Sequence, residues 1–145
     1  MAKIILADDH KKLVDDLTKI IRMLGHDVTT VPDGTDLVEK LAEALPNNKY
    51  DLIISDLRMK WLSGMDVFMY LKEKPKIMID NLIAKHDVTP DQFAEAYQDT
   101  PKVLFTGTIF SDTDEEIVLG YVDKLISKPR IDKLKKYIND LFKNS

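Results

Sequence analysis

Short apolar runs alternate along this chain with longer stretches of helical period, and this alternation limits its possible folds more than any other feature. The first run, Lys3–Ala7, is continuous and rich in β-branched residues, as expected for a strand buried on both faces. Apolar residues then recur every three or four positions until Gly25, a typical helix stop. Further strands are predicted at Asp27–Val31, Tyr50–Ser55, Val103–Thr106 and Val122–Ser127. The pattern predicts an α/β protein with a doubly wound, five-stranded parallel sheet and helices on both faces.

Helices are predicted between these strands and after the last one. They cover Leu37, Val38, Leu41 and Leu45; Gly64–Glu73; Asp112–Leu119; and a closing stripe of Ile131, Leu134, Ile138 and Leu141. The segment Pro75–Thr100 is long for a connection, since about 2–6 residues are usual, so we expect an insertion before strand four. Thr89-Pro90-Asp91 predicts a helix start inside it, whereas Lys76–Asp80 fits a strand or a helical turn equally well.

Length and composition place the chain among soluble globular proteins. A chain of 145 residues usually forms one domain, here residues 1–145, and the absence of cysteine excludes a disulfide scaffold. Neither a signal-peptide pattern nor an apolar run of membrane-spanning length is present, so we expect a cytoplasmic protein with no membrane contact. The net charge of −4 argues against nonspecific binding of nucleic acid.

Polar side chains stand where the predicted strands end. Asp8 and Asp9 follow the first strand, Asp56 follows the third, Thr106 ends the fourth and Lys128 follows the fifth. The carboxyl ends of parallel strands share one edge of the sheet, where ligands bind in such folds. We therefore expect these five side chains to lie close together.

This set of residue types suits phosphoryl chemistry. Carboxylates in contact repel one another, and a hard oxygen site with room for water suits Mg²⁺. We expect Mg²⁺ to be held by Asp8, Asp9 and one oxygen of Asp56, whose other oxygen attacks a phosphoryl group to form an aspartyl phosphate. Lys128 and the Thr106 hydroxyl would stabilise the charge on the phosphoryl oxygens.

Each of these residues also has a simpler interpretation. The Asp8-Asp9 pair could cap the following helix, and Asp56 could be an ordinary turn residue. Thr106 could be a β-branched strand end, and Lys128 a solvated charge. Their shared place at one edge favours the functional interpretation.

Two smaller groups of residues are expected to be structural. The three histidines, His10, His26 and His86, lack metal-binding spacing and are predicted to be surface residues. Phe93 and Tyr97 are predicted to form an apolar pad that packs the insertion against the domain.

Several short motifs connect the chain to a known family. They are Ala7-Asp8-Asp9, Ile53–Met59, Gly64, Val103–Gly107 and Lys128-Pro129. Together they resemble the CheY-like receiver domain of two-component response regulators, over essentially the whole chain except Pro75–Thr100. The resemblance implies a flavodoxin-like fold.

The resemblance also implies roles for individual residues. Asp56 would be phosphorylated by a sensor histidine kinase or a histidine phosphotransfer protein, with Thr106 and Lys128 binding the phosphoryl group. Mg²⁺ would be held by Asp8, Asp9, Asp56 and the backbone carbonyl of Arg58. Such a domain accepts a phosphoryl group and loses it by hydrolysis, but is not a turnover enzyme. By the same analogy, Arg58 and Thr108 lie at the mouth of the pocket and tune that hydrolysis.

Partner binding is expected on the face that the family forms from helix four, strand five and helix five, with a downstream protein or a second copy as partner. Leu125 stands where the family commonly has a switching Tyr or Phe, which puts an aromatic switch in doubt.

Two alternatives remain open. One is a receiver-like interaction module that is not phosphorylated. The other is a haloacid-dehalogenase-type phosphatase, although that class has a second Asp where this chain has Arg58.

Overall fold

The computed structural model describes residues 1–73 and 75–143. Its elements are β1 (Lys3–Ala7), α1 (Lys11–Met23), β2 (Asp27–Val31), α2 (Gly34–Glu43), β3 (Leu52–Ser55), α3 (Gly64–Glu73), α4 (Ile77–Ala84), α5 (Pro90–Tyr97), β4 (Lys102–Thr106), α6 (Asp112–Val118), β5 (Lys124–Ser127) and α7 (Ile131–Phe142). All the strand pairs are parallel, in the order β2-β1-β3-β4-β5. The predicted doubly wound sheet is confirmed.

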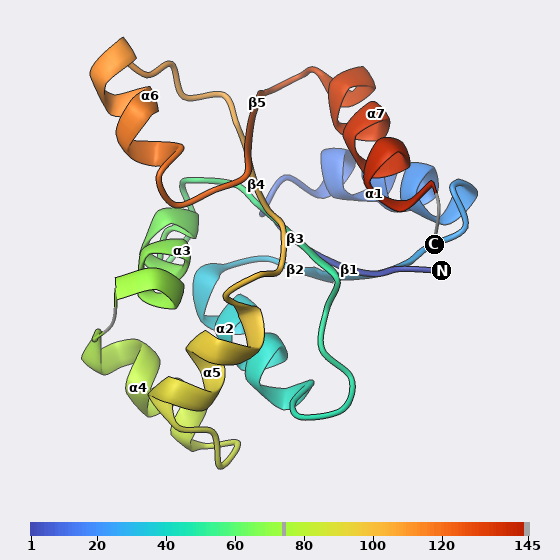
Figure 1. The fold of residues 1–145 in the computed structure, drawn as a ribbon. Coiled ribbons are helices and arrows are strands. Elements are labelled where there is room, and N and C mark those ends of the chain that lie inside the picture. The colour runs from blue at the N-terminus through green and yellow to red at the C-terminus, as the bar shows by residue number, and fades with distance from the viewer. Residues whose placement is uncertain (74, 144–145) are drawn as a thin grey trace.

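The sheet lies between two groups of helices (Figure 1), and an apolar core fills the space on each of its faces. Successive side chains of a strand point to opposite faces, so Ile4 and Leu6 pack with α1 and α7. Ile5 and Ala7 instead join the core that α2, α3, α4 and α5 cover. Because both faces are covered, the central strands β1 and β3 are largely apolar, and the polar residues of the predicted site lie where strands end.

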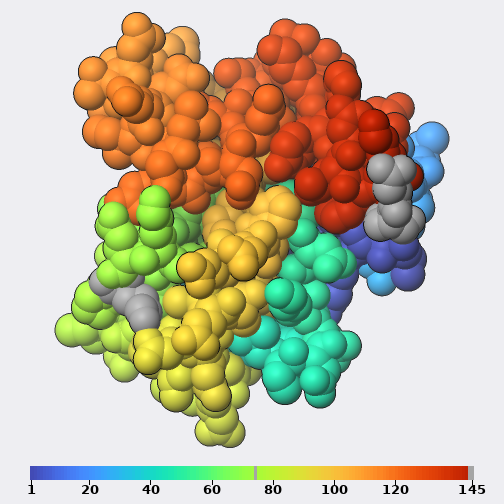
Figure 2. Space-filling view, in the orientation of Figure 1, coloured from blue at the N-terminus to red at the C-terminus, as the bar shows by residue number. Residues whose placement is uncertain are grey.

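The segment between α3 and β4 contains two helices. The region that could have been a strand is the start of α4, in which Ile79 and Ile83 are fully buried on one helical face. α5 begins at the predicted place, with the Thr89 side chain accepting a hydrogen bond from the backbone of Gln92. In Figure 2 these helices, in yellow-green and yellow, form the lower left and lower centre of the visible surface.

Side chains on both helices attach this segment to the domain. The Tyr70 hydroxyl on α3 donates a hydrogen bond to Asp80 on α4 at 2.5 Å. The Tyr97 hydroxyl on α5 donates one to the Leu41 carbonyl on α2 at 2.7 Å. Phe93 and Tyr97 are fully buried, which agrees with the prediction that they pack the segment against the domain.

Lys102, the first residue of β4, holds the end of α5. Its ammonium donates hydrogen bonds to the carbonyls of Tyr97 and Thr100, both at 2.7 Å, and to that of Gln98 at 3.3 Å. Its burial lowers the pKa of the lysine, while Asp123 and Asp99 act in the opposite direction. The strand that carries Thr106 is therefore fixed at its other end to α5.

Two strands are shorter than predicted. β3 begins at Leu52 rather than Tyr50, and β5 at Lys124 rather than Val122. Tyr50 and Val122 are nevertheless buried, because an apolar run marks burial and not the start of strand pairing. The longest described helix, α1, has 13 residues, and no helix within 1–73 or 75–143 is long and apolar enough to cross a bilayer.

The helix α6 is only loosely attached to the core. It projects away from the sheet in Figures 1 and 2, where it forms the orange lobe at the upper left. Val118 is its buried residue, whereas Ile117 is 58% exposed and Leu119, just after the helix, is 46% exposed. Its first turn is acidic.

Candidate functional site

The carboxyl ends of four neighbouring strands form an open cleft of about 800 Å³. β1, β3, β4 and β5 are adjacent in the sheet, so the residues that follow them reach the same edge. The lining consists of Asp9, His10, Asp56, Arg58, Thr106, Gly107, Thr108, Ile109 and Lys128. Asp8 lies beneath the cleft, where its carboxylate contacts Lys128.

Lys128 joins two of the carboxylates. Its ammonium nitrogen lies 2.8 Å from Oδ2 of Asp8 and 3.2 Å from Oδ2 of Asp56. Asp8 and Asp56 are only 3% and 6% exposed. Buried carboxylates are costly unless a cation or hydrogen bonds compensate them, and Lys128 supplies that charge.

The carboxylate of Asp56 is held in a defined position. Oδ1 of Asp56 accepts a hydrogen bond from the Leu57 N–H at 2.7 Å, and the Asp56 N–H donates to the Ala7 carbonyl at 2.8 Å. The Asp56 carbonyl accepts from the Ser55 hydroxyl at 2.8 Å. Gly64 lies so close that a Cβ there would be 2.4 Å from the same carbonyl. These contacts leave Oδ2 facing Lys128.

Thr106 brings a hydroxyl to the cleft from the end of β4. It is 2% exposed, and its Oγ1 accepts a hydrogen bond from the Thr108 N–H at 3.2 Å. Arg58 and Thr108 lie in the lining, with Arg58 exposed, where the sequence placed them at the pocket mouth. Gly107 has open space where a Cβ would be, so the cleft stays accessible beside Thr106.

The donor set fits a divalent cation. Asp8, Asp9, His10 and Asp56 each offer a ligand atom, and these atoms lie within 4.8 Å of one another. Three carboxylates form a hard oxygen site, and the half-exposed side chain of Asp9 leaves room for water on the cation. This chemistry is the one that Mg²⁺ requires.

The histidines differ from the sequence prediction in two cases. His10 has an exposed side chain, as expected, but its ring contacts both acidic residues that precede it. His26 and His86 are half-buried; Nδ1 of His26 accepts a hydrogen bond from the Ala2 N–H at 3.0 Å. The prediction that all three are surface residues is therefore wrong for His26 and His86. The signal missed for His10 was its place directly after an acidic pair.

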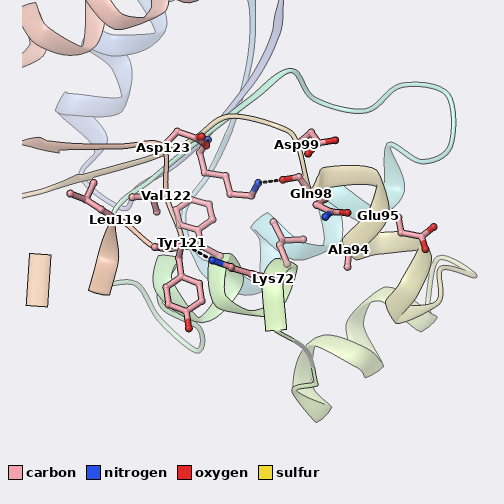
Figure 3. Close-up of a pocket in the computed structure, with 13 residues that line it drawn as sticks. Lys72, Ala94, Glu95, Gln98, Asp99, Leu119, Tyr121, Val122 and Asp123 are labelled. Carbon is pink, nitrogen blue, oxygen red and sulfur yellow. Dashed lines mark hydrogen bonds between the residues drawn. The ribbon is translucent and has the colours of Figure 1, made fainter. Parts of the chain in front are cut away.

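A second hollow, of about 500 Å³, lies at the opposite edge of the sheet, at the amino ends of β4 and β5 (Figure 3). Lys72 lies there with its ammonium 2.8 Å from the Gly120 carbonyl and over the Tyr121 ring. None of the residues predicted to act on a ligand lies in this hollow. The predicted set is therefore confined to the carboxyl edge of the sheet.

A comparison with protein-family models decides the family. The model of the response regulator receiver domain matches residues 4–88, more than half of the chain. The chain belongs to this family. Asp8, Asp9, Asp56 and Arg58 lie within the matched part of the receiver, whereas Thr106 and Lys128 lie beyond it.

Related proteins include kinases and DNA-binding regulators. "Probable histidine kinase 1" of Oryza sativa subsp. indica is 26% identical over 141 residues, which cover 88% of this receiver and 14% of that protein. DNA-binding response regulator MtrA of Mycobacterium tuberculosis is 32% identical over 85 residues, which cover 59% of this chain and 36% of MtrA. The chain thus spans well under two thirds of these relatives.

Solved structures confirm the flavodoxin-like receiver fold. The Francisella response regulator 1452 receiver domain has a TM-score of 0.69 and 23% identity, with 99% of this chain and 98% of that chain covered. Chemotaxis response regulator CheY4 of Vibrio cholerae has a TM-score of 0.70 and 18% identity, with 97% of this chain and 98% of that chain covered. The receiver domain of sensor histidine kinase PA1611 of Pseudomonas aeruginosa has a TM-score of 0.67 and 18% identity, with 96% of this chain and 95% of that chain covered. That structure has a magnesium ion coordinated in its active-site cleft.

Proposed function

We propose that Asp56 of this receiver accepts a phosphoryl group with the help of a divalent cation, and that phosphorylation changes its binding to a protein partner. The observation that carries the proposal is the contact of the Lys128 ammonium with Oδ2 of Asp56, at 3.2 Å. A phosphoryl group attached at that oxygen brings its negative charge to the lysine, where charge-assisted hydrogen bonds stabilise it.

The transfer step uses groups that the cleft provides. Oδ2 of Asp56 attacks the phosphorus in line, and the new O–P bond forms as the bond to the donor breaks. The donor is the phosphohistidine of a sensor kinase or phosphotransfer protein, whose imidazole nitrogen leaves with the bonding electrons. Lys128 and the Thr106 hydroxyl stabilise the charge on the phosphoryl oxygens. The domain is loaded once by this step and then loses its phosphoryl group to water, without turnover of a substrate.

The cation site in this proposal consists of Asp8, Asp9, Asp56 and the backbone carbonyl of Arg58. When bound, Mg²⁺ supplies positive charge that compensates the carboxylates and the phosphoryl oxygens. Asp8 is oriented for this role because its Oδ1 accepts the backbone N–H of His10 at 2.9 Å. Its other oxygen contacts Lys128.

The output surface is proposed to be the face of α6, β5 and α7, which binds a downstream protein or a second copy of the chain. α6 follows Thr106 closely in the chain and has few buried contacts, so it can change position at low cost. Leu125 on β5 packs against the core cluster and has no ring to rotate. We therefore propose that the phosphoryl group acts on α6 through the loop after Thr106.

Intact-mass measurement after treatment with acetyl phosphate and Mg²⁺ tests the acceptor. We expect one phosphoryl adduct on the wild type, none on Asp56→Asn, and the wild-type adduct on Asp112→Asn, which removes an exposed carboxylate on α6. An adduct that persists on Asp56→Asn would contradict Asp56 as the acceptor. No adduct on the wild type would favour the unphosphorylated interaction module.

Hydrogen exchange tests the proposed output surface. Phosphorylation should change exchange in residues 107–119 of the wild type and leave Asp56→Asn unchanged. Unaltered exchange across α6, β5 and α7 in a protein shown by mass to be phosphorylated would contradict this surface.

A further inference from the structure

The imidazole of His10 lies at the carboxylates that form the proposed cation site. We propose that His10 is a nitrogen ligand of this cation, so that the site favours a first-row transition ion such as Mn²⁺ or Co²⁺ more strongly than three carboxylates alone would. The inference rests on the proposed function, because it assumes that a cation binds in the cleft.

The position of the ring nitrogen matches that of a metal ligand. Nδ1 of His10 lies 2.9 Å from Oδ1 of Asp8 and 3.2 Å from Oδ1 of Asp9. In an octahedral site with metal–ligand distances of about 2.1 Å, neighbouring ligand atoms lie about 3.0 Å apart. The nitrogen is therefore spaced from two carboxylate oxygens as adjacent ligands of one ion are.

The backbone explains why the ring faces the carboxylates. His10 is the N-cap residue of α1, with φ −85° and ψ 95°, but its side chain makes no capping hydrogen bond. An N-cap side chain usually accepts a hydrogen bond from the first turn of its helix. Here the His10 N–H donates to Oδ1 of Asp8 instead, and this turn places the ring beside Asp8 and Asp9.

In the structure Nδ1 of His10 is hydrogen-bonded to Oδ1 of Asp8, and a bound cation would replace this contact. The geometry favours a ligand position because the same nitrogen lies near a second carboxylate, that of Asp9. Oδ2 of Asp8 is in contact with Lys128, so Oδ1 and the ring remain on the side of Asp9. The side chain of His10 is 67% exposed, so an ion can reach the nitrogen from solvent.

The chemical consequence is a change of metal preference. Mg²⁺ prefers oxygen ligands and keeps much of its water, whereas imidazole is a common ligand of first-row transition ions. Loss of the ring should therefore weaken Co²⁺ and Mn²⁺ binding and affect Mg²⁺ much less.

The test measures metal binding on the complete chain. Isothermal titration with Mg²⁺ and Co²⁺ compares the wild type with His10→Ala and with His10→Asn, which keeps a good N-cap residue. His86→Gln is the matched control, since it removes a histidine that lies 3.8 Å from Glu39, away from the cleft. We expect both His10 variants to lose about tenfold in Co²⁺ affinity relative to Mg²⁺, and the control to lose nothing.

Pulsed electron paramagnetic resonance of Mn²⁺ gives a direct signature. The wild type and His86→Gln should show the nitrogen modulation of a bound imidazole, which shifts on ¹⁵N-histidine labelling and is absent in both His10 variants. The wild type could bind a cation and be phosphorylated at Asp56 but show no nitrogen modulation, or all variants could have the same ratio of Co²⁺ to Mg²⁺ affinity. Either result would overturn the role of His10 and leave the proposed function intact. Failure of the wild type to bind any divalent cation would overturn both.

Discussion

The ammonium of Lys128 lies 3.2 Å from Oδ2 of Asp56, and the same nitrogen lies 2.8 Å from Asp8. One side chain therefore compensates two buried carboxylates, and in the proposed function it also binds the phosphoryl oxygens. These two tasks have opposite consequences when the charge is removed.

Lys128→Ala should slow phosphorylation and tighten cation binding. Loss of a charge-assisted contact to the phosphoryl oxygens should reduce the rate by about tenfold or more. Loss of a positive charge beside the carboxylates should strengthen Mg²⁺ binding by about 1 kcal/mol, roughly fivefold. Intact-mass measurement over time gives the rate of phosphorylation, and titration with Mg²⁺ gives the affinity for the cation. Lys124→Ala, on the exposed surface of β5, is the control, and equal labelling rates in the two variants would contradict the assignment.

Mg²⁺ should raise the thermal stability of the wild type, and chelation should remove the effect. A ligand that binds only the native state stabilises it by about 2.7 kcal/mol at roughly a hundredfold excess over Kd. Asp9→Asn should lose this gain, whereas Asp16→Asn, on the surface of α1, should keep it. Thermal unfolding with and without Mg²⁺ measures the difference. A full gain in Asp9→Asn would exclude Asp9 as a ligand.

Two glycines beside the cleft should respond differently to an added methyl group. A Cβ on Gly64 would lie 2.4 Å from the Asp56 carbonyl and 2.7 Å from the Ser55 hydroxyl, so the backbone must move. Gly64→Ala should lower the free energy of unfolding by about 1–3 kcal/mol and weaken Mg²⁺ binding. Gly107→Ala meets open space and should change stability by less than about 0.5 kcal/mol. Urea unfolding of Gly64→Ala and Gly107→Ala measures both free energies of unfolding. Similar losses in the two variants would refute the packing argument.

Lys102→Met should weaken the attachment of α5. The substitution leaves three carbonyls at the end of α5 without their cationic donor, and we expect a loss of about 1–3 kcal/mol in unfolding free energy. Lys49→Met removes an exposed lysine contact to the Ala96 carbonyl of the same helix and should cost less than about 0.5 kcal/mol. Urea unfolding measures the stability of the two variants, and hydrogen exchange in α5 reports how firmly this helix is attached. An equal, small loss in both variants would show that burial of Lys102 contributes little.

Acid should destabilise the protein partly through His26. Burial, and then the amino terminus, lower the pKa of His26 below its ordinary value of 6.5. The unfolded chain therefore binds a proton that the folded chain resists, so this contribution to stability is present above about pH 6.5 and declines as the pH falls. His26→Asn should lose stability less steeply than the wild type between about pH 7.5 and pH 5.5. Urea unfolding at several pH values measures this. The same pH dependence of the unfolding free energy in the wild type and in His26→Asn would contradict the prediction.

The convergence of the site residues could be predicted from the sequence because of a general property of parallel sheets. Once Lys3–Ala7, Leu52–Ser55 and Lys124–Ser127 are identified as parallel strands, the residues that follow them must meet at one edge. Asp8, Asp56 and Lys128 follow directly. Only the approximate ends of the strands were needed, so the errors at Tyr50 and Val122 did not matter.

The fold of the segment 75–100 could be predicted only in part. Thr89 and Pro90 are local signals, because a cap and a fixed φ act within one helical turn. Lys76–Asp80 carries no such signal, since a short apolar run suits a strand or a helix equally well. In the structure this segment is helical: Ile79 and Ile83 pack in the core on the α2 side, whereas Ile77, which would share their face in a strand, is exposed.

The sequence by itself determined the order of the elements, the parallel sheet and the edge at which the polar residues gather, because periodicity and strand ends are local properties of the chain. Tertiary structure alone decided the burial of Lys102. A lysine is ordinarily exposed, and Lys102 is buried because the end of α5 presents three carbonyls to its ammonium. This burial depends on contacts whose geometry exists only after α5 and β4 have packed together.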